Sequence, residues 1–199
     1  MPKAFTEQEK QVLRTQLHEK GKKLFEKQGV KKTSVDELAQ AVGISKGAFY
    51  LFYESKEELF LEILEQLEQE IQATILEFTI KPKADTKKNV SDMLTAFLLT
   101  RNTYPLLKNF GKSEFEYLLR KVPPEWVLKH ANKDEEFIEQ FIKKIKQEGI
   151  VVKASPRVVS NLIKTLFFAG LYLEELGQET HKETMDVLIN MVAGYIVGE

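Results

Sequence analysis

Apolar residues recur at helical spacing over most of the chain, and this pattern constrains the fold more than any other feature. The clearest stretch follows Lys56, where apolar residues return every three or four positions for about six turns, as far as Phe78. The segment Lys81-Pro82-Lys83 then breaks the pattern. Only 10 glycines and 6 prolines occur in 199 residues, too few for the many turns of a β-sandwich or barrel. The sequence therefore predicts an all-α protein of about nine or ten helices.

The composition excludes several classes of functional site. The chain has no cysteine, so disulfides, thiolate metal ligands and a cysteine nucleophile are ruled out. The histidines, His18, His130 and His181, are scattered and do not fall at a metal-binding spacing. No serine, histidine and acid grouping, paired carboxylates or phosphate loop stands out. We therefore expect no metal, no cofactor and no enzymatic activity.

The N-terminus and the apolar runs predict the cellular location. The first residues lack the apolar stretch of a secretory signal, and the longest apolar runs, near residues 166–173 and 191–197, are far shorter than about 18 residues. We expect a cytoplasmic protein that does not contact a membrane.

The net charge of −1 does not decide whether the protein binds nucleic acid, because binding depends on whether basic groups share one face.

Three helices are predicted near the N-terminus, and a glycine turn joins the second to the third. The first is expected after Thr6 and stops at Gln28-Gly29. A second is expected over residues 35–42, and a third, capped by Ser45, over residues 46–53. A turn as short as Gly43-Ile44 between two helices is typical of a helix-turn-helix.

The remaining helical patterns suggest a larger body behind this head. They cover residues 85–103, 105–111, 113–122, 125–132, 134–147, 155–176 and 179–197. The long helix that begins at Lys56 links the two parts, so the domain boundary is expected within it. We predict a three-helix DNA-binding head over residues 1–60 and a helical regulatory and dimerisation body over residues 61–199.

The segment from Thr33 to Leu59 resembles the DNA-binding head of the tetracycline-repressor (TetR) family. The resemblance extends over residues 10–66 and includes Leu24-Phe25, Gly29, Thr33, Ala39, Gly43, Ser45-Lys46-Gly47, Tyr50 and Ser55-Lys56-Glu57. The chain departs from the family pattern at Ala48, where threonine is common, and at Leu51, where histidine is common. These changes remove polar groups from the third helix, which is the reading helix that enters the DNA groove in this family. The resemblance therefore does not indicate which operator sequence the protein binds. The resemblance implies a homodimeric transcription factor, usually a repressor that a small ligand releases from a palindromic DNA operator.

Eight residues of the head are candidates for contact with double-stranded DNA. They are Thr33, Ser34, Ser45, Lys46, Gly47, Tyr50, Tyr53 and Lys56. Thr33 and Ser34 are expected to cap the second helix and to donate to phosphate. Of Phe52 and Tyr53, one is expected in the core and the other, Tyr53, at the DNA edge. Lys56 is expected to hold a phosphate with Ser55.

Lys46, Gly47 and Tyr50 are the candidates nearest the bases. Lys46 lies at the start of the reading helix, the end that enters the major groove, and Tyr50 follows it by one turn. Gly47 costs about 1 kcal/mol in a helix relative to alanine, which makes sense where backbone must approach DNA closely. The alternatives are that Lys46 is simply an exposed lysine and that Gly47 leaves room for packing under the first helix.

Bulky aromatic residues spread over positions 85–177 predict a largely apolar pocket for a small organic effector in the body. Pro105 and Pro123-Pro124 are expected to break the helices into short pieces that line it. The candidate lining residues are Phe97, Arg101, Tyr104, Phe110, Trp126, Phe137, Phe141, Asn161 and Phe168.

The last two helices are the predicted homodimer interface, because their apolar residues cover more than one stripe each. The candidates are Leu162, Leu166, Ala169, Gly170, Leu173, Leu188, Met191, Gly194 and Tyr195. The small residues among them permit two helices to approach closely. The alternative to a DNA-binding regulator is an all-helical interaction bundle or an enzyme without DNA binding.

Overall fold

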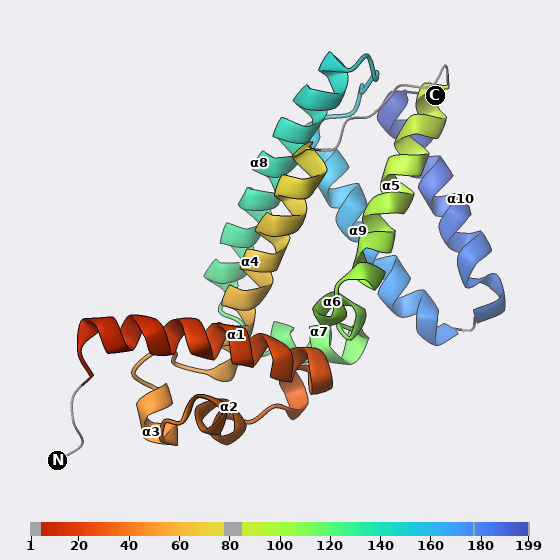
Figure 1. Cartoon of the computed structure of the whole chain (residues 1–199). Helices are drawn as coiled ribbons and strands as arrows, with labels where there is room; N and C mark the ends of the chain where they lie inside the picture. The colour runs from red at the N-terminus through yellow and green to blue at the C-terminus, as the bar shows by residue number, and fades with distance from the viewer. Residues whose placement is uncertain (1–4, 78–84, 177, 199) are drawn as a thin grey trace. The chain divides into compact units, whose positions relative to one another are not determined.

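The computed structural model describes residues 5–77, 85–176 and 178–198, except the side chains of residues 127–132 and 173–179. Within these ranges the chain forms ten α-helices and no strand (Figure 1), which confirms the all-α prediction. They are α1 (Glu7–Lys32), α2 (Val35–Val42), α3 (Lys46–Phe49), α4 (Lys56–Glu77), α5 (Thr86–Thr103), α6 (Pro105–Lys108), α7 (Lys112–Leu119), α8 (Pro124–Gln147), α9 (Pro156–Leu176) and α10 (Gln178–Val197).

The chain packs into two compact units, which we call the head unit and the body unit. The head unit comprises residues 1–70 and 104–122, and the body unit comprises residues 71–103 and 123–199. The short helices α6 and α7 therefore belong to the head unit, although α5 separates them from α4 in the sequence. The functional division between residues 60 and 61 stays a prediction, since packing alone does not test it.

A glycine interrupts α1 near its end. Gly29 has φ +77°, in the left-handed region that favours glycine, so the helical backbone breaks there as the sequence predicted. One further helical turn runs to Lys32, beyond the predicted stop at Gln28-Gly29. The chain then becomes extended at Thr33 before the next helix.

Capping interactions define the two helices of the helix-turn-helix. Ser34 and Glu37 form a capping box at the start of α2, and Gly43 ends α2 with φ +77°. Ser45 caps α3 by accepting a hydrogen bond from the Ala48 N–H at 3.2 Å. The cap at Ser45 and the glycine turn after α2 were predicted from the sequence.

The third helix is shorter than predicted. The expected helix over residues 46–53 ends at Phe49, and residues 50–52 form a turn. The reason lies in the hydrogen bonds from the N–H of Leu51 to the Ala48 carbonyl and from that of Phe52 to the Phe49 carbonyl. These bonds span three residues instead of four, which tightens the end of the helix.

Aromatic side chains from distant segments pack in the core of the head unit. Phe25 of α1 packs edge-to-face with Phe60 of α4, with ring centroids 5.2 Å apart. Phe110, between α6 and α7, stacks on Phe60 at 6.1 Å and meets Phe115 of α7 at 6.4 Å. This packing explains why α6 and α7 belong to the head unit.

The body unit has its own hydrophobic core, built from α5, α8, α9 and α10 with the end of α4. The segment 124–147 forms one helix, not the two pieces predicted over 125–132 and 134–147, because it contains no internal glycine or proline to stop it. Across the described residues, no helix combines the length and apolarity that crossing a bilayer requires.

Candidate nucleic-acid interface

The face of α3 that points to solvent carries Lys46 and Gly47 together with Tyr50 and Leu51 from the turn that follows. All four residues are exposed, whereas Phe49 and Tyr53 are buried. Residues 46 and 47 open α3, and residues 50 and 51 belong to the turn that ends it, so the four exposed residues lie within about one turn of backbone. We call Ser45, Lys46, Gly47, Tyr50 and Leu51 the reading face.

Lys46 is held in a charged state at the solvent surface. Its Nζ donates a hydrogen bond to Asp36 Oδ2 at 2.8 Å, and both side chains are more than half exposed. This hydrogen bond to the Asp36 carboxylate raises the pKa of Lys46 above its ordinary value. A charged, solvent-exposed ammonium group can donate to base edges or to phosphate.

Gly47 has no neighbour in this chain that excludes a side chain. A Cβ atom at this position would meet only Ser45 Oγ, at 3.9 Å, which is ordinary contact. The structure therefore contradicts the alternative that Gly47 leaves room for packing under the first helix.

Tyr53 does not lie at the outer edge, and this prediction is wrong. Its side chain is 2% exposed, it packs against Phe49, and its hydroxyl donates to Glu62 at 3.2 Å. The guanidinium of Arg14 lies 5.0 Å from the ring centroid. Burial, followed by the nearby Glu62 carboxylate, raises the pKa of Tyr53. The chain turns after Phe49, which directs Tyr53 inward and leaves Phe52 partly exposed.

Lys56 and Thr33 close the end of α1 and are not directed to solvent. Lys56 Nζ donates to the carbonyl oxygens of Val30 at 2.8 Å, Lys31 at 3.1 Å and Thr33 at 2.6 Å. An ammonium group has three donors, so the predicted phosphate contact of Lys56 has none left in this structure. Thr33 is 1% exposed, and its hydroxyl donates to the Gly29 carbonyl at 2.7 Å. Ser34 alone caps α2, which corrects the expectation that both residues do.

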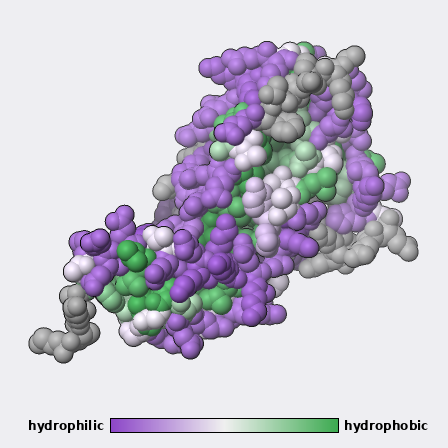
Figure 2. Space-filling view, viewed as in Figure 1, coloured by the Kyte–Doolittle hydropathy of each residue, from purple (hydrophilic) through white to green (hydrophobic). Residues whose placement is uncertain are grey.

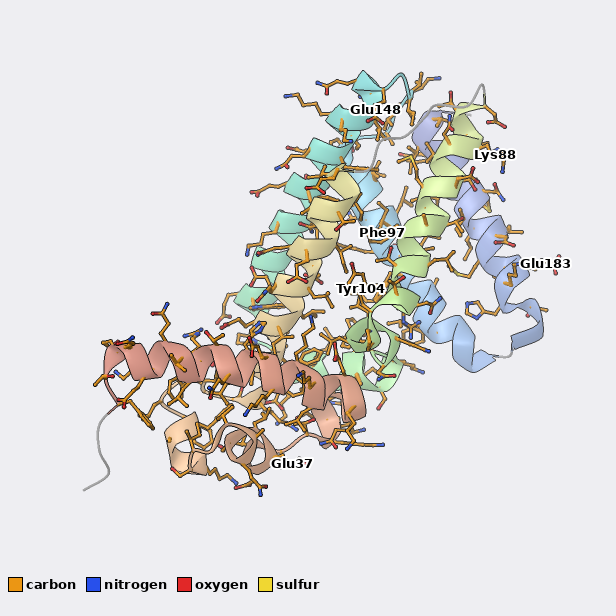
Figure 3. All side chains as sticks on the ribbon, in the orientation of Figure 1. Glu37, Lys88, Phe97, Tyr104, Glu148 and Glu183 are labelled. Atoms are coloured by element: carbon orange, nitrogen blue, oxygen red, sulfur yellow. The ribbon has the colours of Figure 1, made fainter. Side chains whose placement is uncertain are left out.

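Ser34 is occupied by its capping partner. Its hydroxyl donates to Glu37 Oε2 at 2.8 Å and accepts from the Glu37 N–H at 3.2 Å. A hydrogen bond from Gln28, and then those from Ser34, lower the pKa of Glu37, so this carboxylate stays charged beside the start of α2. Glu37 is labelled on α2 in Figure 3. The phosphate contact of Ser34 stays a prediction.

Contacts from α7 reach the end of α1 and the start of α4, on either side of the helix-turn-helix, and sequence reasoning missed them. Glu114 accepts a hydrogen bond from the Lys31 N–H at 3.1 Å. The Tyr117 hydroxyl donates to Glu57 at the start of α4, and Lys56 Nζ lies 5.6 Å from the Tyr117 ring centroid. Burial, followed by the hydrogen bond to Glu57, raises the pKa of Tyr117 to about 12. The partners are 60 and 83 residues apart, so no local pattern announces them.

The body unit contains a cavity of about 430 Å³, within the usual range for small-molecule sites. Apolar side chains of α5, α8 and α9 form most of its wall, and three of the predicted residues, Phe97, Phe137 and Phe141, line it. Figure 2 shows hydrophobic surface between α5 and α8, and Figure 3 labels Phe97 on α5. Its polar lining groups come from Thr74, Asn89, Asp92 and Thr100.

The other predicted pocket residues lie elsewhere. Phe110 and Tyr104 belong to the head unit, where Phe110 is buried against Phe60. The remaining four belong to the body unit but do not line the cavity: Arg101, Trp126, Asn161 and Phe168. The cavity wall consists of long helices, because the proline-bounded pieces α6 and α7 pack in the head unit. The expectation that short pieces line the pocket is therefore wrong.

The predicted dimer residues divide into exposed and buried groups. Met191 and Tyr195 are exposed on α10, and Leu162, Ala169, Gly170 and Leu188 are partly exposed. Leu166 and Gly194 are already buried by their own chain, so they have no surface to bury in a partner, which corrects their assignment. The side chain of Leu173 lies outside the described residues. Val187, which the sequence reasoning did not select, is exposed one turn before Met191.

The helix-turn-helix segment matches a known family. Residues 17–63 match the sequence profile of the bacterial regulatory proteins of the tetR family. The HTH-type transcriptional regulator AcrR of Shigella flexneri is 36% identical over 115 residues, which cover 55% of this chain and 54% of AcrR. The helix-turn-helix segment of the chain is therefore a TetR-type DNA-binding domain. The chain matches about half of the length of AcrR.

Solved structures show the TetR fold over nearly the whole chain. A TetR-family transcriptional regulator from Pectobacterium atrosepticum superposes with a TM-score of 0.67 at 18% identity, covering 98% of this chain and 97% of that one. RolR in complex with its ligand resorcinol superposes with a TM-score of 0.62 at 13% identity, with the same coverage. The predicted TetR fold, a helix-turn-helix head followed by a helical body, is confirmed.

Proposed function

We propose that this TetR-family protein is a homodimeric DNA-binding repressor that a small, largely apolar ligand releases from a palindromic operator. The reading face carries the proposal. It presents a charged lysine at 2.8 Å from Asp36, an open glycine and a tyrosine on one side of α3. A helix N-terminus that combines a charged donor with bare backbone is suited to the major groove.

The cavity of the body unit supports the ligand part of the proposal. Its volume of about 430 Å³ and its apolar wall suit an organic molecule of modest size. RolR, which shares the fold, was solved with resorcinol, an aromatic compound, bound. Asp92, a charged lining group, is paired with Lys88 at 3.3 Å, so an uncharged ligand fits best.

The exposed apolar residues of α10 support a dimer. Val187, Met191 and Tyr195 repeat every four residues and form one solvent-facing stripe, which a second copy would cover. Two copies related by a two-fold axis match a palindromic operator. A repressor of this kind acts on DNA, so we place it in the cytoplasm.

DNA binding is tested by selecting duplexes from fragmented genomic DNA and measuring affinity by fluorescence anisotropy at several salt concentrations. Lys46→Ala should weaken binding to the selected duplex by about 5- to 150-fold, as expected for a lost base contact. Lys88→Ala is the matched control, because Lys88 is also an exposed lysine paired with an aspartate. Equal effects of the two substitutions, or no salt-dependent binding to any duplex, would contradict the proposal.

The ligand step is tested with a library of uncharged aromatic and aliphatic compounds, scored for release of the selected duplex. Ala96→Phe narrows the cavity that Ala96 lines, and it should abolish the response while leaving DNA binding intact. Asn102→Phe adds the same side chain at an exposed position of α5 outside the lining. A response that persists in Ala96→Phe would exclude this cavity as the ligand site.

A further inference from the structure

Leu51 is an exposed leucine on the reading face. Its side chain is 66% exposed, the highest value among large apolar residues in the described part of the chain, shared only with Met191. The neighbouring Tyr50 is 51% exposed. Figure 2 shows hydrophobic surface on the head unit. Among the side chains of the reading face, that of Leu51 alone carries no charged or hydrogen-bonding group.

The position of Leu51 places it at the approach to the groove. Leu51 lies four residues after Gly47, both residues are exposed, and a Cβ added to Gly47 would meet only Ser45 Oγ at 3.9 Å. Bare backbone at Gly47 lets a groove come close, and a duplex that comes close to Gly47 also reaches Leu51. The turn that holds Leu51 is fixed, since its N–H donates to the Ala48 carbonyl at 3.1 Å.

The chemistry of a leucine side chain restricts what it can recognise in DNA. It has no donor or acceptor, so it cannot pair with the polar edges of guanine, cytosine or adenine, and it gains nothing from a phosphate. Thymine alone presents an apolar group in the major groove, its C5-methyl. An apolar side chain in this groove therefore discriminates by burying that methyl group.

We propose that Leu51 is a specificity-determining residue that reads the C5-methyl group of a thymine in each half-site. The inference rests on the proposed function, because it requires the reading face to enter the major groove. It predicts that each DNA half-site has an A·T pair opposite Leu51, a property that the resemblance to the TetR family does not specify. The hydrogen-bonding contacts of Lys46 then read the neighbouring pairs.

The test begins with the full-length protein and a library of random duplexes, from which bound sequences are selected. Thymines of the selected half-site are then replaced one at a time by deoxyuridine, which removes only the C5-methyl group and keeps base pairing. The replacement opposite Leu51 should weaken binding about four-fold per half-site, the value of one buried methyl group. Replacements at the other thymines should have little effect.

A double-mutant cycle assigns the methyl contact to Leu51. In Leu51→Ala, replacing this thymine by deoxyuridine should leave the DNA affinity nearly unchanged, because the side chain that contacts the methyl group is missing. Leu119→Ala is the matched control, since Leu119 is an exposed leucine at the end of α7 in the same unit, and it should keep the full penalty. Leu51 is exposed, so its substitution leaves the core of the head unit intact.

The outcomes separate this inference from the proposed function. If selection enriches no duplex, the proposed function fails and the inference fails with it. If duplexes are enriched but no single deoxyuridine weakens binding, the protein binds DNA and the inference alone is overturned. A penalty that is equal in Leu51→Ala and in the unchanged protein would assign the methyl contact to another residue and also overturn it.

Discussion

Gly47 occupies a helical position where the protein itself has room for a side chain. A Cβ atom there would make only one ordinary contact, with Ser45 Oγ. Glycine in a helix is less stable than alanine by about 0.5–1 kcal/mol, so this residue costs stability without an internal reason. The cost is explained if a duplex must approach the backbone.

Gly47→Ala should therefore separate stability from DNA binding. The free energy of unfolding should rise by up to about 1 kcal/mol, measured by urea denaturation. Affinity for the selected duplex should fall at the same time, because the added methyl group holds the backbone away from the groove. Gly111→Ala, at another open position, should leave affinity unchanged. If Gly47→Ala binds the selected duplex with unchanged affinity, close approach of DNA does not explain the glycine at this position.

The residues of the reading face could be predicted from the sequence only where local spacing decides their position. Lys46 and Tyr50 are one turn apart and lie on one exposed side, as periodicity indicated. Tyr53 and Lys56 were misplaced because their partners, Glu62 on α4 and the carbonyls at the end of α1, are set by packing. Spacing along one helix cannot show which side another helix will cover.

At the scale of helices, α1 packs on α4 with an unsatisfied histidine at the contact. His18 Nε2 is buried and has no hydrogen-bond partner in the described part of the chain. Burial, the largest influence, lowers the pKa of His18 below its ordinary 6.5, while the Glu62 carboxylate acts in the opposite direction. The folded protein therefore binds a proton at His18 less readily than the unfolded chain does.

This difference predicts a loss of stability in mild acid. The contribution of His18 is complete above the unfolded pKa near 6.5 and is lost as the pH falls from there through the lower folded pKa. In His18→Gln the side chain no longer titrates, so the dependence of the unfolding free energy on pH should flatten in this range. The measurement is urea denaturation followed by circular dichroism at a series of pH values. Identical slopes in the two proteins would show that His18 does not contribute.

Helix boundaries could be predicted where a cap marks them. Ser34, Gly43 and Ser45 carry their own hydrogen bonds, so α2 and the start of α3 lie where the sequence placed them. The end of α3 depends on a tightened turn that no residue type signals, and α8 runs without interruption where a boundary was expected at Lys133. Local chemistry determines helix starts better than it determines where helices continue.

At the scale of the whole molecule, the stripe of Val187, Met191 and Tyr195 should hold two copies together. Met191→Glu places a charge in this stripe in both copies, so its effect counts twice. Loss of two buried methionine side chains alone should raise the dimer dissociation constant about 100-fold. Sedimentation equilibrium measures this change, and operator affinity should fall with it.

Leu99→Glu provides the control for this substitution. Leu99 is also a large apolar residue that is more than half exposed, but it belongs to α5 and is not part of the stripe on α10. The same charge there should leave the protein dimeric. If both variants remain dimers at micromolar concentration, the interface lies elsewhere.

The cavity could be anticipated in kind but not in detail. A surplus of aromatic residues predicted an apolar pocket, and Phe97, Phe137 and Phe141 line one. The assignment of Phe110 failed because the chain returns through α6 and α7 to the head unit, where this ring stacks on Phe60. Composition reports how many bulky side chains must be buried, whereas the path of the chain decides where each one goes.

The return of the chain through α6 and α7 has a consequence for synthesis on the ribosome. The head unit is complete only when residues 104–122 are present, since Phe110 covers Phe60 and Glu114 holds the Lys31 N–H. A nascent chain that has emerged only as far as α5 leaves these groups uncovered. The N-terminal part of this protein therefore waits for nearly two thirds of the chain to be translated before it can close, although N-terminal domains generally fold first.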